Sequence, residues 1–326
     1  MQVGITALIP PEIIFATGNI PVDVNNFIPF NDDLYPLPKL CSWSASWRDL
    51  IINGKIPIDA LAIVAGGDCH NTLVDGERVE KSGFPAHYFF YPMDADADYF
   101  SSQIDSLIDF LGGLKKEEYF DVIYEIKEKL KRIEYMRKDS DVSPEEIFSL
   151  VISASDMKSS VSKYGEMVDD ILALMESYKE YNNGNNNNGN SKIINVGLIG
   201  VPPIMNDFHA VLMENGFRTV YDELPWEFIR LGGKTTKEIT MNYMDYSFAK
   251  HIDRRIKIIK EEIKKRNIEA LVHYTQFSCH HILEDDIFRN AIDIPILTIQ
   301  GDLPGKTPEQ SKLRIEAFHE MLEGVQ

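Results

Sequence analysis

The residues of this chain best suited to metal chemistry are its three cysteines, Cys41, Cys69 and Cys279. They are widely separated and none belongs to a C-x-x-C pair, so their local spacing is not that of a metal-binding motif. Spacing alone favours buried thiols, because a free cysteine usually packs as a small hydrophobic residue. If the three thiolates met in space, they would instead hold a [4Fe–4S] cluster and leave one iron open to water or a substrate oxygen. A nucleophilic cysteine is a further alternative, although no Cys/His order in the sequence supports it.

Histidines and one carboxylate are the other candidates for chemistry. A zinc site formed by the three thiolates and one of His70, His280 or His281 is an alternative to a cluster, since Cys₃His is a common zinc ligand set. His280 and His281 directly follow Cys279, where they would line a site or act as hydrogen-bonded spectators at a helix start. Glu12, which follows a Pro-Pro pair, is a candidate pocket carboxylate, although an acid in a first helical turn also has a structural explanation. Glu12 and His280 are therefore the candidate catalytic residues, and neither has an assigned role.

The segment around Cys279 predicts the element that positions it. An apolar run, Ala270–Tyr274, is short enough for a buried strand, and Cys279 comes just after it. A helix-like segment follows, and then a second apolar run, Pro295–Ile299. Strand, helix and strand in that order predict a βαβ unit with parallel strands. Cys279 therefore falls at the carboxyl end of a strand, where open α/β sheets bind their ligands.

The same pattern occurs earlier in the chain, in Asp59–Asp94. A shift of 210 positions (279 − 69) places the pair Cys69-His70 on Cys279-His280, and Pro85 on Pro295. A second similarity is independent of the first: VGITALIPP near the start and VGLIGVPP after residue 195 both read as a strand closed by Pro-Pro. Internal repeats of this kind predict two copies of one α/β domain, each presenting a cysteine after an equivalent strand.

The predicted organisation has four parts. They are an N-terminal α/β domain over 1–111 that carries Cys41 and Cys69, a helical segment over 112–181, an Asn/Gly-rich flexible joint over 182–191, and a C-terminal α/β domain over 192–326 that carries Cys279. The dense charge of the helical segment predicts a solvated face, so we expect no chemistry from it. A proline-rich loop, Leu34–Lys39, is expected to deliver Cys41 to a helix start, and Ser247–Arg266 is predicted to be one long helix.

Bulk properties exclude several classes of protein. A formal net charge of −18 over 326 residues argues against nucleic-acid binding, which needs a basic face. No apolar run approaches the roughly 20 residues of a membrane span. The N-terminus lacks a basic start and carries Pro10-Pro11, so no signal peptide is predicted. We therefore expect a cytoplasmic protein with reduced thiols. No G-x-G-x-x-G or phosphate-binding loop is present, so no nucleotide site is expected.

Taken in order, these residues resemble a known family. The segments PPEIIFATGNIPV, LCSWSASWRDLI, GGDCHNT and ALVHYTQFSCHHI, followed by PILTIQGD and RIEAFHEML, are similar to the D-component (beta-subunit) family of 2-hydroxyacyl-CoA dehydratases. That family includes the 2-hydroxyglutaryl-CoA and phenyllactyl-CoA dehydratases and the benzoyl-CoA reductase subunits. The resemblance spans nearly the whole chain, and its most specific feature is the order of the three cysteines with their flanks.

The resemblance implies a fold, a cofactor and a reaction. The fold would be α/β, with two flavodoxin-like parallel-sheet domains and an intervening helical segment. A [4Fe–4S] cluster would be held on three cysteines, whose positions match Cys41, Cys69 and Cys279. A separate ATP-hydrolysing activator with its own iron–sulfur cluster would inject one electron. The thioester would become a ketyl radical anion that expels the 2-hydroxyl group, loses a β-proton and returns the electron, so the enzyme would be a hydro-lyase.

The resemblance also implies partners and an alternative. Family enzymes pair two homologous subunits, so the chain is expected to pair with a homologue or with itself. No residue stands out for recognition of coenzyme A, and the acyl group is not indicated. The alternative function is an ATP-driven reductase or electron-transfer component, benzoyl-CoA reductase-like or double-cubane-like. A double-cubane cluster would need about twice as many thiolates as this chain has.

Overall fold

The computed structural model describes residues 1–28, 40–66, 69–182 and 193–324 of the chain. The predicted loop Leu34–Lys39 and, apart from Asn182, the predicted joint at 182–191 lie outside these residues. The described residues contain two four-stranded sheets, and every strand pairing within them is parallel. The prediction of an α/β fold is therefore confirmed.

The two sheets share one strand order. The first, β2-β1-β3-β4, contains β1 (Gln2–Ile5), β2 (Ile20–Asp23), β3 (Ala60–Gly66) and β4 (Ala86–Phe90). The second, β6-β5-β7-β8, contains β5 (Ile194–Gly200), β6 (Phe217–Asp222), β7 (Ala270–Gln276) and β8 (Ile296–Gly301). This order is that of the first four strands of a flavodoxin-like sheet.

Strand register supports the duplication. Leu61 on β3 pairs with Ala86 on β4, and Leu271 on β7 pairs with Ile296 on β8, so both partners move by the same 210 positions (271 − 61 and 296 − 86). The apolar runs that predicted these strands are buried over their whole length or nearly so. Strands covered on both faces read as continuous apolar runs, which is why the two central strands were visible in the sequence.

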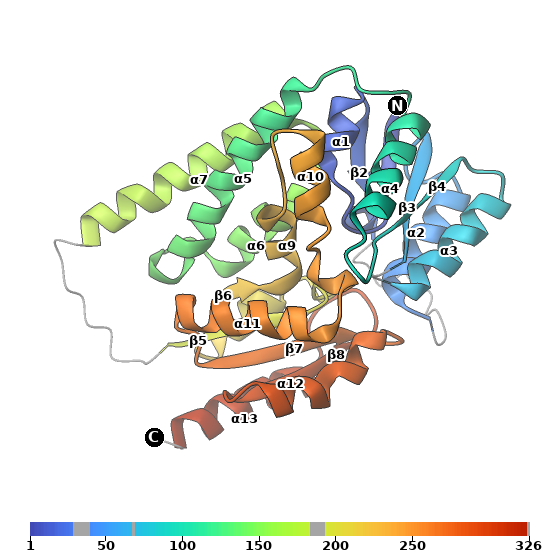
Figure 1. The fold of residues 1–326 in the computed structure, drawn as a ribbon. Coiled ribbons are helices and arrows are strands. Elements are labelled where there is room, and N and C mark those ends of the chain that lie inside the picture. The colour runs from blue at the N-terminus through green and yellow to red at the C-terminus, as the bar shows by residue number, and fades with distance from the viewer. Residues whose placement is uncertain (29–39, 67–68, 183–192, 325–326) are drawn as a thin grey trace.

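Helices connect and cover the strands. In chain order they are α1 (Pro11–Ala16), α2 (Ser42–Ile52), α3 (His70–Lys81), α4 (Ala97–Phe110), α5 (Glu118–Met136), α6 (Pro144–Ile152), α7 (Val161–Asn182), α8 (Phe208–Glu214), α9 (Glu223–Arg230), α10 (Thr236–Tyr243), α11 (Ile252–Arg266), α12 (Asp285–Ala291) and α13 (Glu309–Gly324). Short 3₁₀ helices occur at Val24–Phe27, Arg137–Asp139, Ser153–Ser155, Met157–Ser159, Ser247–Ala249 and His280–Glu284. Figure 1 shows the long helices α5 and α7 side by side, with α11, α12 and α13 around the second sheet. No helix within these ranges combines the length and hydropathy needed to cross a membrane.

Two predictions about helices were wrong. The helix predicted over Ser247–Arg266 starts only at Ile252, because Ser247–Ala249 forms a 3₁₀ turn and Lys250 is extended. His251 then caps the new start, where its side chain accepts a hydrogen bond from the backbone of Asp253.

The second error concerns the charge of the helical segment, which is not all solvated. Lys127, Glu134 and Arg137 are at most 2% exposed. Lys127 and Glu134 follow the buried Phe120 at steps of seven residues, so they lie on the same buried stripe of α5. One hydrophobic cluster joins this segment to both sheets.

Candidate functional site

A cavity of about 370 Å³ lies at the carboxyl ends of strands from both sheets. All three cysteines line it, together with Thr6 just after β1 and Gln276 at the end of β7. Each cysteine directly precedes a helix: Cys41 comes before α2, Cys69 before α3, and Cys279 before the 3₁₀ helix His280–Glu284. The structure thus brings the three sequence-predicted cysteines, 238 positions apart at most (279 − 41), to one cavity.

Contacts between the two cysteine loops show how the halves meet. The side chain of Asn71 donates a hydrogen bond from Nδ2 to the backbone oxygen of Ser278, at 3.0 Å. The rings of His70 and His280 meet edge to face, with centroids 6.2 Å apart. The two Cys-His pairs that the repeat made equivalent are therefore neighbours across the junction of the halves. Ser278 has φ 64°, a left-handed conformation that turns the chain just before Cys279.

Burial keeps two of the three thiols, Cys41 and Cys279, in their protonated form. Loss of solvent raises the pKa of Cys41 and raises the pKa of Cys279 to about 12. Charge on Cys69 or on Cys41 would raise the pKa of Cys279 further. The backbone N–H of Ser44 acts in the opposite direction and lowers the pKa of Cys41. Thiols with raised pKa values stay protonated at neutral pH and are weak nucleophiles. A metal that replaces the proton removes this limit, so the site suits a metal better than nucleophilic catalysis.

The cavity wall also carries polar atoms without partners. Nε1 of Trp43 and Oε1 of Gln276 are buried and have no hydrogen-bond partner within the described ranges. Buried polar atoms are rarely left unsatisfied in native proteins, so these atoms indicate that a polar group belongs in the cavity. Three thiols and an unpaired indole N–H suit a group that presents iron to the sulfurs and sulfide acceptors to the donor.

A zinc site is less well supported by the geometry. Ligand atoms of Cys279, His280 and His281 lie within 4.8 Å of one another. Nδ1 of His281, however, is 2.8 Å from Oε2 of Glu284 and 3.1 Å from Nη1 of Arg255. The adjacent guanidinium opposes a cation at this ring. His280 is partly exposed, and burial with nearby positive charge lowers its pKa to about 4, so the ring is neutral at pH 7.

Glu12, the candidate pocket carboxylate, does not line this cavity. It is fully buried, with Oε1 2.6 Å from Nζ of Lys127 and Oε2 2.8 Å from the hydroxyl of Tyr243. Nζ of Lys127 also donates to the backbone oxygen of Leu231 at 2.9 Å. These contacts join α1, α5 and α10, so Glu12 has a structural partner in each of two other helices.

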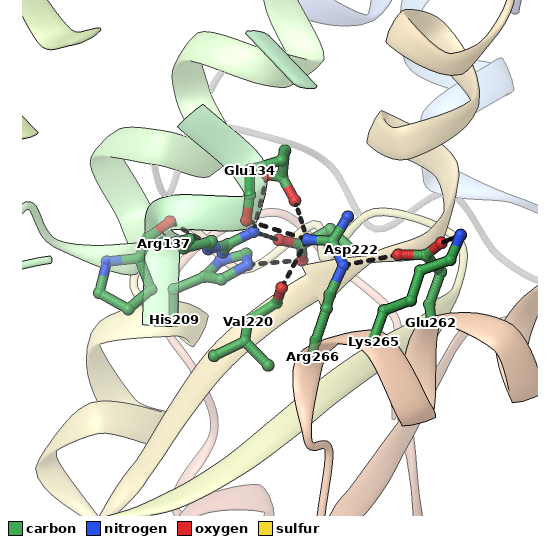
Figure 2. A network of polar contacts seen from close by, with 9 residues as sticks. Glu134, Arg137, His209, Val220, Asp222, Glu262, Lys265 and Arg266 are labelled. Atoms are coloured by element: carbon green, nitrogen blue, oxygen red, sulfur yellow. Dashed lines mark hydrogen bonds and ion pairs between the residues drawn. The ribbon is translucent and has the colours of Figure 1, made fainter. Parts of the chain in front are cut away.

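A second polar network reaches the cavity through a residue that the sequence did not reveal. His209 of α8 lines the cavity, and its Nε2 is 2.9 Å from Oδ1 of Asp222 on β6 (Figure 2). Asp222 is held in turn by Arg137, with Nη1 2.6 Å from Oδ2. Burial alone would raise the pKa of Asp222, but the charge of Arg137 and the contact with His209 lower it. Figure 2 shows the network continuing through Glu134 to Arg266 of α11.

Sequence signals for these residues were weak. His209 belongs to no motif; its partner Asp222 is 13 positions away (222 − 209), and Arg137, which holds Asp222, is 72 positions from His209 (209 − 137). Asn71 and Gln276 lie close to the predicted cysteine loops, but amides at strand ends are common in turns. For Lys127 a signal existed, because seven positions separate it from Phe120 on the apolar stripe of its helix.

Comparison with known proteins adds one informative match. A model of the family described as 2-hydroxyglutaryl-CoA dehydratase, D-component, matches residues 6–322. No curated protein matches the chain. Among solved structures, the SBP FpvC from Pseudomonas aeruginosa in complex with Mn2+ aligns with 100% of this chain and 99% of that chain. Its sequence identity is 8% and its TM-score is 0.23, so this likeness carries no structural argument.

Proposed function

The chain belongs to the 2-hydroxyglutaryl-CoA dehydratase D-component family, and from that membership we propose that it dehydrates a 2-hydroxyacyl-CoA with a [4Fe–4S] cluster held by Cys41, Cys69 and Cys279. The observation that supports this proposal is the meeting of three distant cysteines in one cavity at the carboxyl ends of both sheets. Cys41 and Cys279 are buried, Cys69 is half-buried, and none of the three forms a disulfide, so all three sulfurs remain available as ligands.

Each cysteine would be held by its place before a helix. Backbone N–H groups at a helix start favour negative charge, so they stabilise thiolates and an anionic cluster. When bound, the cluster would supply an electron carrier and, at its open iron, a Lewis acid. The apolar side chains of Leu8, Trp47 and Phe228 line the same cavity and would limit access of water to it.

Carboxamides give the cavity its means of holding a substrate. Asn25, Asn71, Asn206 and Gln276 line it. An amide both donates and accepts hydrogen bonds, so this set suits a hydroxyl and a thioester oxygen, the two polar groups next to the reacting carbons. The acyl group would then lie against the apolar part of the wall. Members of this family work with a separate activator, and we propose that an ATP-dependent iron–sulfur protein supplies the electron here. A homologous subunit or a second copy would complete the enzyme, in the cytoplasm.

Anaerobic purification followed by iron and acid-labile sulfide analysis tests the cluster. We expect about four irons and four sulfides per chain, and a large loss of both in each of C41S, C69S and C279S. S101C, on α4, serves as a control that adds a thiol elsewhere. Zinc without sulfide in the wild-type protein would overturn the proposal.

Electron paramagnetic resonance of the reduced protein tests the reaction class. Addition of a 2-hydroxyacyl-CoA is expected to change the cluster signal, because the substrate would approach the open iron. A signal unchanged by several different thioesters would favour the reductase or electron-relay alternative over a dehydratase.

A further inference from the structure

We infer that His209 exchanges protons with the substrate in the cysteine-lined cavity and that Asp222 is its positioning residue; the inference rests on the proposed dehydratase function. Neither residue belongs to the cysteine loops. Among the described residues that line the cavity, His209 is the only histidine.

The ring of His209 is fixed on two sides. It is 4% exposed, and its Nε2 is 2.9 Å from Oδ1 of Asp222. The ring of Phe148, from α6, packs against it with centroids 4.3 Å apart. Phe148 lines the same cavity, so the imidazole is held in the cavity wall rather than free to turn into the core.

This arrangement determines which ring nitrogen can act as a base. Asp222 is 2% exposed and forms an ion pair with Arg137 at 2.6 Å, so its carboxylate is ionised and can only accept a hydrogen bond. Nε2 of His209 must therefore carry the proton, which leaves the lone pair on Nδ1. Nδ1 has no hydrogen-bond partner in the part of the chain that the structure describes. A carboxylate that holds one ring nitrogen while the other nitrogen keeps its lone pair is the pairing that a general base uses.

A second cavity gives the proton a route away. His209 also lines a cavity of about 340 Å³ formed by Ser140–Glu145, Ala210, Met213, Glu214 and Arg218. Glu145 is exposed and lines both cavities. His209 thus lies between the inner cavity and a surface cavity that contains carboxylates able to pass a proton to water.

Other titratable groups of the inner cavity are less suited to this role. Oδ1 of Asp23 accepts from the backbone N–H and the side-chain amide of Asn25, at 3.0 and 2.8 Å, which engages its lone pairs. Glu145 is exposed, and no side chain of the described residues holds its carboxylate in a fixed orientation. The three cysteines are assigned to the cluster. The charged groups around His209 are therefore Asp222, with Arg137 behind it, and four groups of the surface cavity: Asp141, Glu145, Glu214 and Arg218.

The net reaction balances, because the electron that the activator would supply is returned at the end of each turnover. Net dehydration breaks the C–O bond at the 2-carbon and a C–H bond at the 3-carbon of the acyl group. Nδ1 of His209 takes the proton from the 3-carbon, and the C–H electron pair becomes the π bond between the two carbons. The hydroxyl group leaves with the C–O electron pair and takes up a proton from solvent to form water, which balances the proton that His209 later releases to solvent. The imidazolium is stabilised by Asp222 until it releases its proton through the surface cavity.

The first test needs neither cluster nor substrate. Long-range ¹H–¹⁵N correlation spectra of histidine-labelled wild-type protein are expected to show His209 as the Nε2–H tautomer above pH 8, assigned by loss of the signal in H209Q. D222N is expected to weaken this preference. Observation of the Nδ1–H tautomer in the wild type would refute the inference while leaving the proposed function intact.

The second test is kinetic, on protein with its cluster and activator. H209Q keeps an amide donor for Asp222 but has no proton-accepting nitrogen, so we expect kcat to fall ~10²- to 10⁴-fold with little change in KM. The primary isotope effect of a 3-deuterated substrate should rise, and the acidic limb of the pH–rate profile should disappear. H251Q, an exposed histidine on the second half, is the matched control and should behave as the wild type. Iron and sulfide content should be equal in all three proteins.

The outcomes separate the two proposals. If H209Q keeps its cluster and retains kcat within about 5-fold of the wild type, with the same isotope effect and pH profile, His209 is a packing residue and the inference is wrong. If the wild type holds no cluster or no thioester is dehydrated, the proposed function fails first, and this inference fails with it.

Discussion

Asp156 is a buried carboxyl beside the cavity, 4% exposed. Its oxygens accept hydrogen bonds from the backbone N–H of Asp23 at 2.9 Å and of Lys158 at 2.8 Å. Burial and then the nearby charge of Asp23 raise the pKa of Asp156 to about 6. The hydrogen bond to Lys158 lies within a left-handed turn, Met157–Ser159, whose three residues have φ of 52°, 48° and 61°. The carboxyl thus holds a strained turn against the strand that leads to the cavity.

A raised pKa makes stability depend on pH in a defined direction. The folded protein binds the Asp156 proton more tightly than the unfolded chain, so this stabilisation is complete below pH 3.8 and is lost as pH rises through about 6. We predict that the wild type loses up to ~3 kcal/mol of unfolding free energy between pH 4 and 7 from this group, and that D156N does not. Urea unfolding at several pH values measures this change in the free energy of unfolding. D169N, at an exposed carboxylate on α7, is the control, and parallel pH curves for wild type and D156N would contradict the prediction.

The buried pair Glu12–Lys127 allows a sharp test of a single ion pair. Both side chains are at most 1% exposed, and burial lowers the pKa of Lys127 while Glu12 opposes that effect. Removal of the amine would leave a buried carboxylate unpaired, so K127M is predicted to cost ~3–5 kcal/mol. K129M, two positions along the same helix, removes an exposed pair with Asp169 and should cost less than ~1 kcal/mol. Similar midpoints of urea unfolding for the two variants would show that the buried pair adds no stability.

At the scale of the secondary-structure elements, the end of β5 shows how closely two neighbouring strands approach each other. Gly200 has φ +93°, and a Cβ built on it would lie 2.2 Å from the backbone oxygen of Tyr274 on the neighbouring strand β7. Backbone cannot yield as a flexible side chain can. G200A is therefore predicted to separate the strands that lead to the cavity and to destabilise the fold by more than ~3 kcal/mol. G54A, also at positive φ but with nothing within 4 Å, should cost only ~1 kcal/mol. Thermal unfolding of both variants measures the two losses of stability. Equal losses would show that the positive φ alone, and not the approach of Tyr274, determines the cost of the substitution.

The sequence predicts an element well where neighbouring residues determine it. It predicts an element poorly where contacts with distant parts of the chain determine it. The strands β3 and β7 are buried on both faces, so their apolar runs are visible, and their common offset of 210 positions revealed the repeat. Helix α2 starts at Ser42, directly after Cys41, so the predicted helix start at this cysteine is confirmed. In contrast, α11 starts five residues late (252 − 247), because a 3₁₀ turn packed in the core interrupts it.

The site follows the same rule. The three cysteines were visible as residue types, and the strand ends predicted where two of them lie. His209 was not visible, because its role depends on Asp222 and Arg137, which come from another strand and another helix. Lys127 was misassigned to a solvated face, since sequence charge alone does not show that Glu12 lies opposite. The domain boundaries at 111 and 181, and the ligand role of the cysteines, stay predictions.

At the scale of the whole molecule, the separate hydrophobic clusters favour independent unfolding of the two halves, and the shared cluster opposes it. Each sheet has an outer hydrophobic cluster of its own, one with Trp47 and Val79 and the other with Phe208 and Phe318. Such separate clusters would allow the halves to unfold independently. A third and larger cluster, however, includes residues of both sheets and of the helical segment between them in sequence. The buried ion pair of Arg266 with Glu134 also joins α11 of the second half to α5.

Because the shared core is the largest cluster, we predict one cooperative unfolding transition rather than two. The tryptophans make this measurable, because each reports on a different cluster: Trp47 lies in that of the first sheet, Trp43 packs against that of the second, and Trp226 lies in the shared core. In W226F and in W43F/W47F, the fluorescence midpoint in urea should coincide with the midpoint from far-ultraviolet circular dichroism of the same variant. The comparison is made within each variant, so the cost of the substitution itself does not affect it. Distinct midpoints, or a plateau in the dichroism between them, would show that the halves unfold separately and that the cysteine cavity opens before the fold is lost.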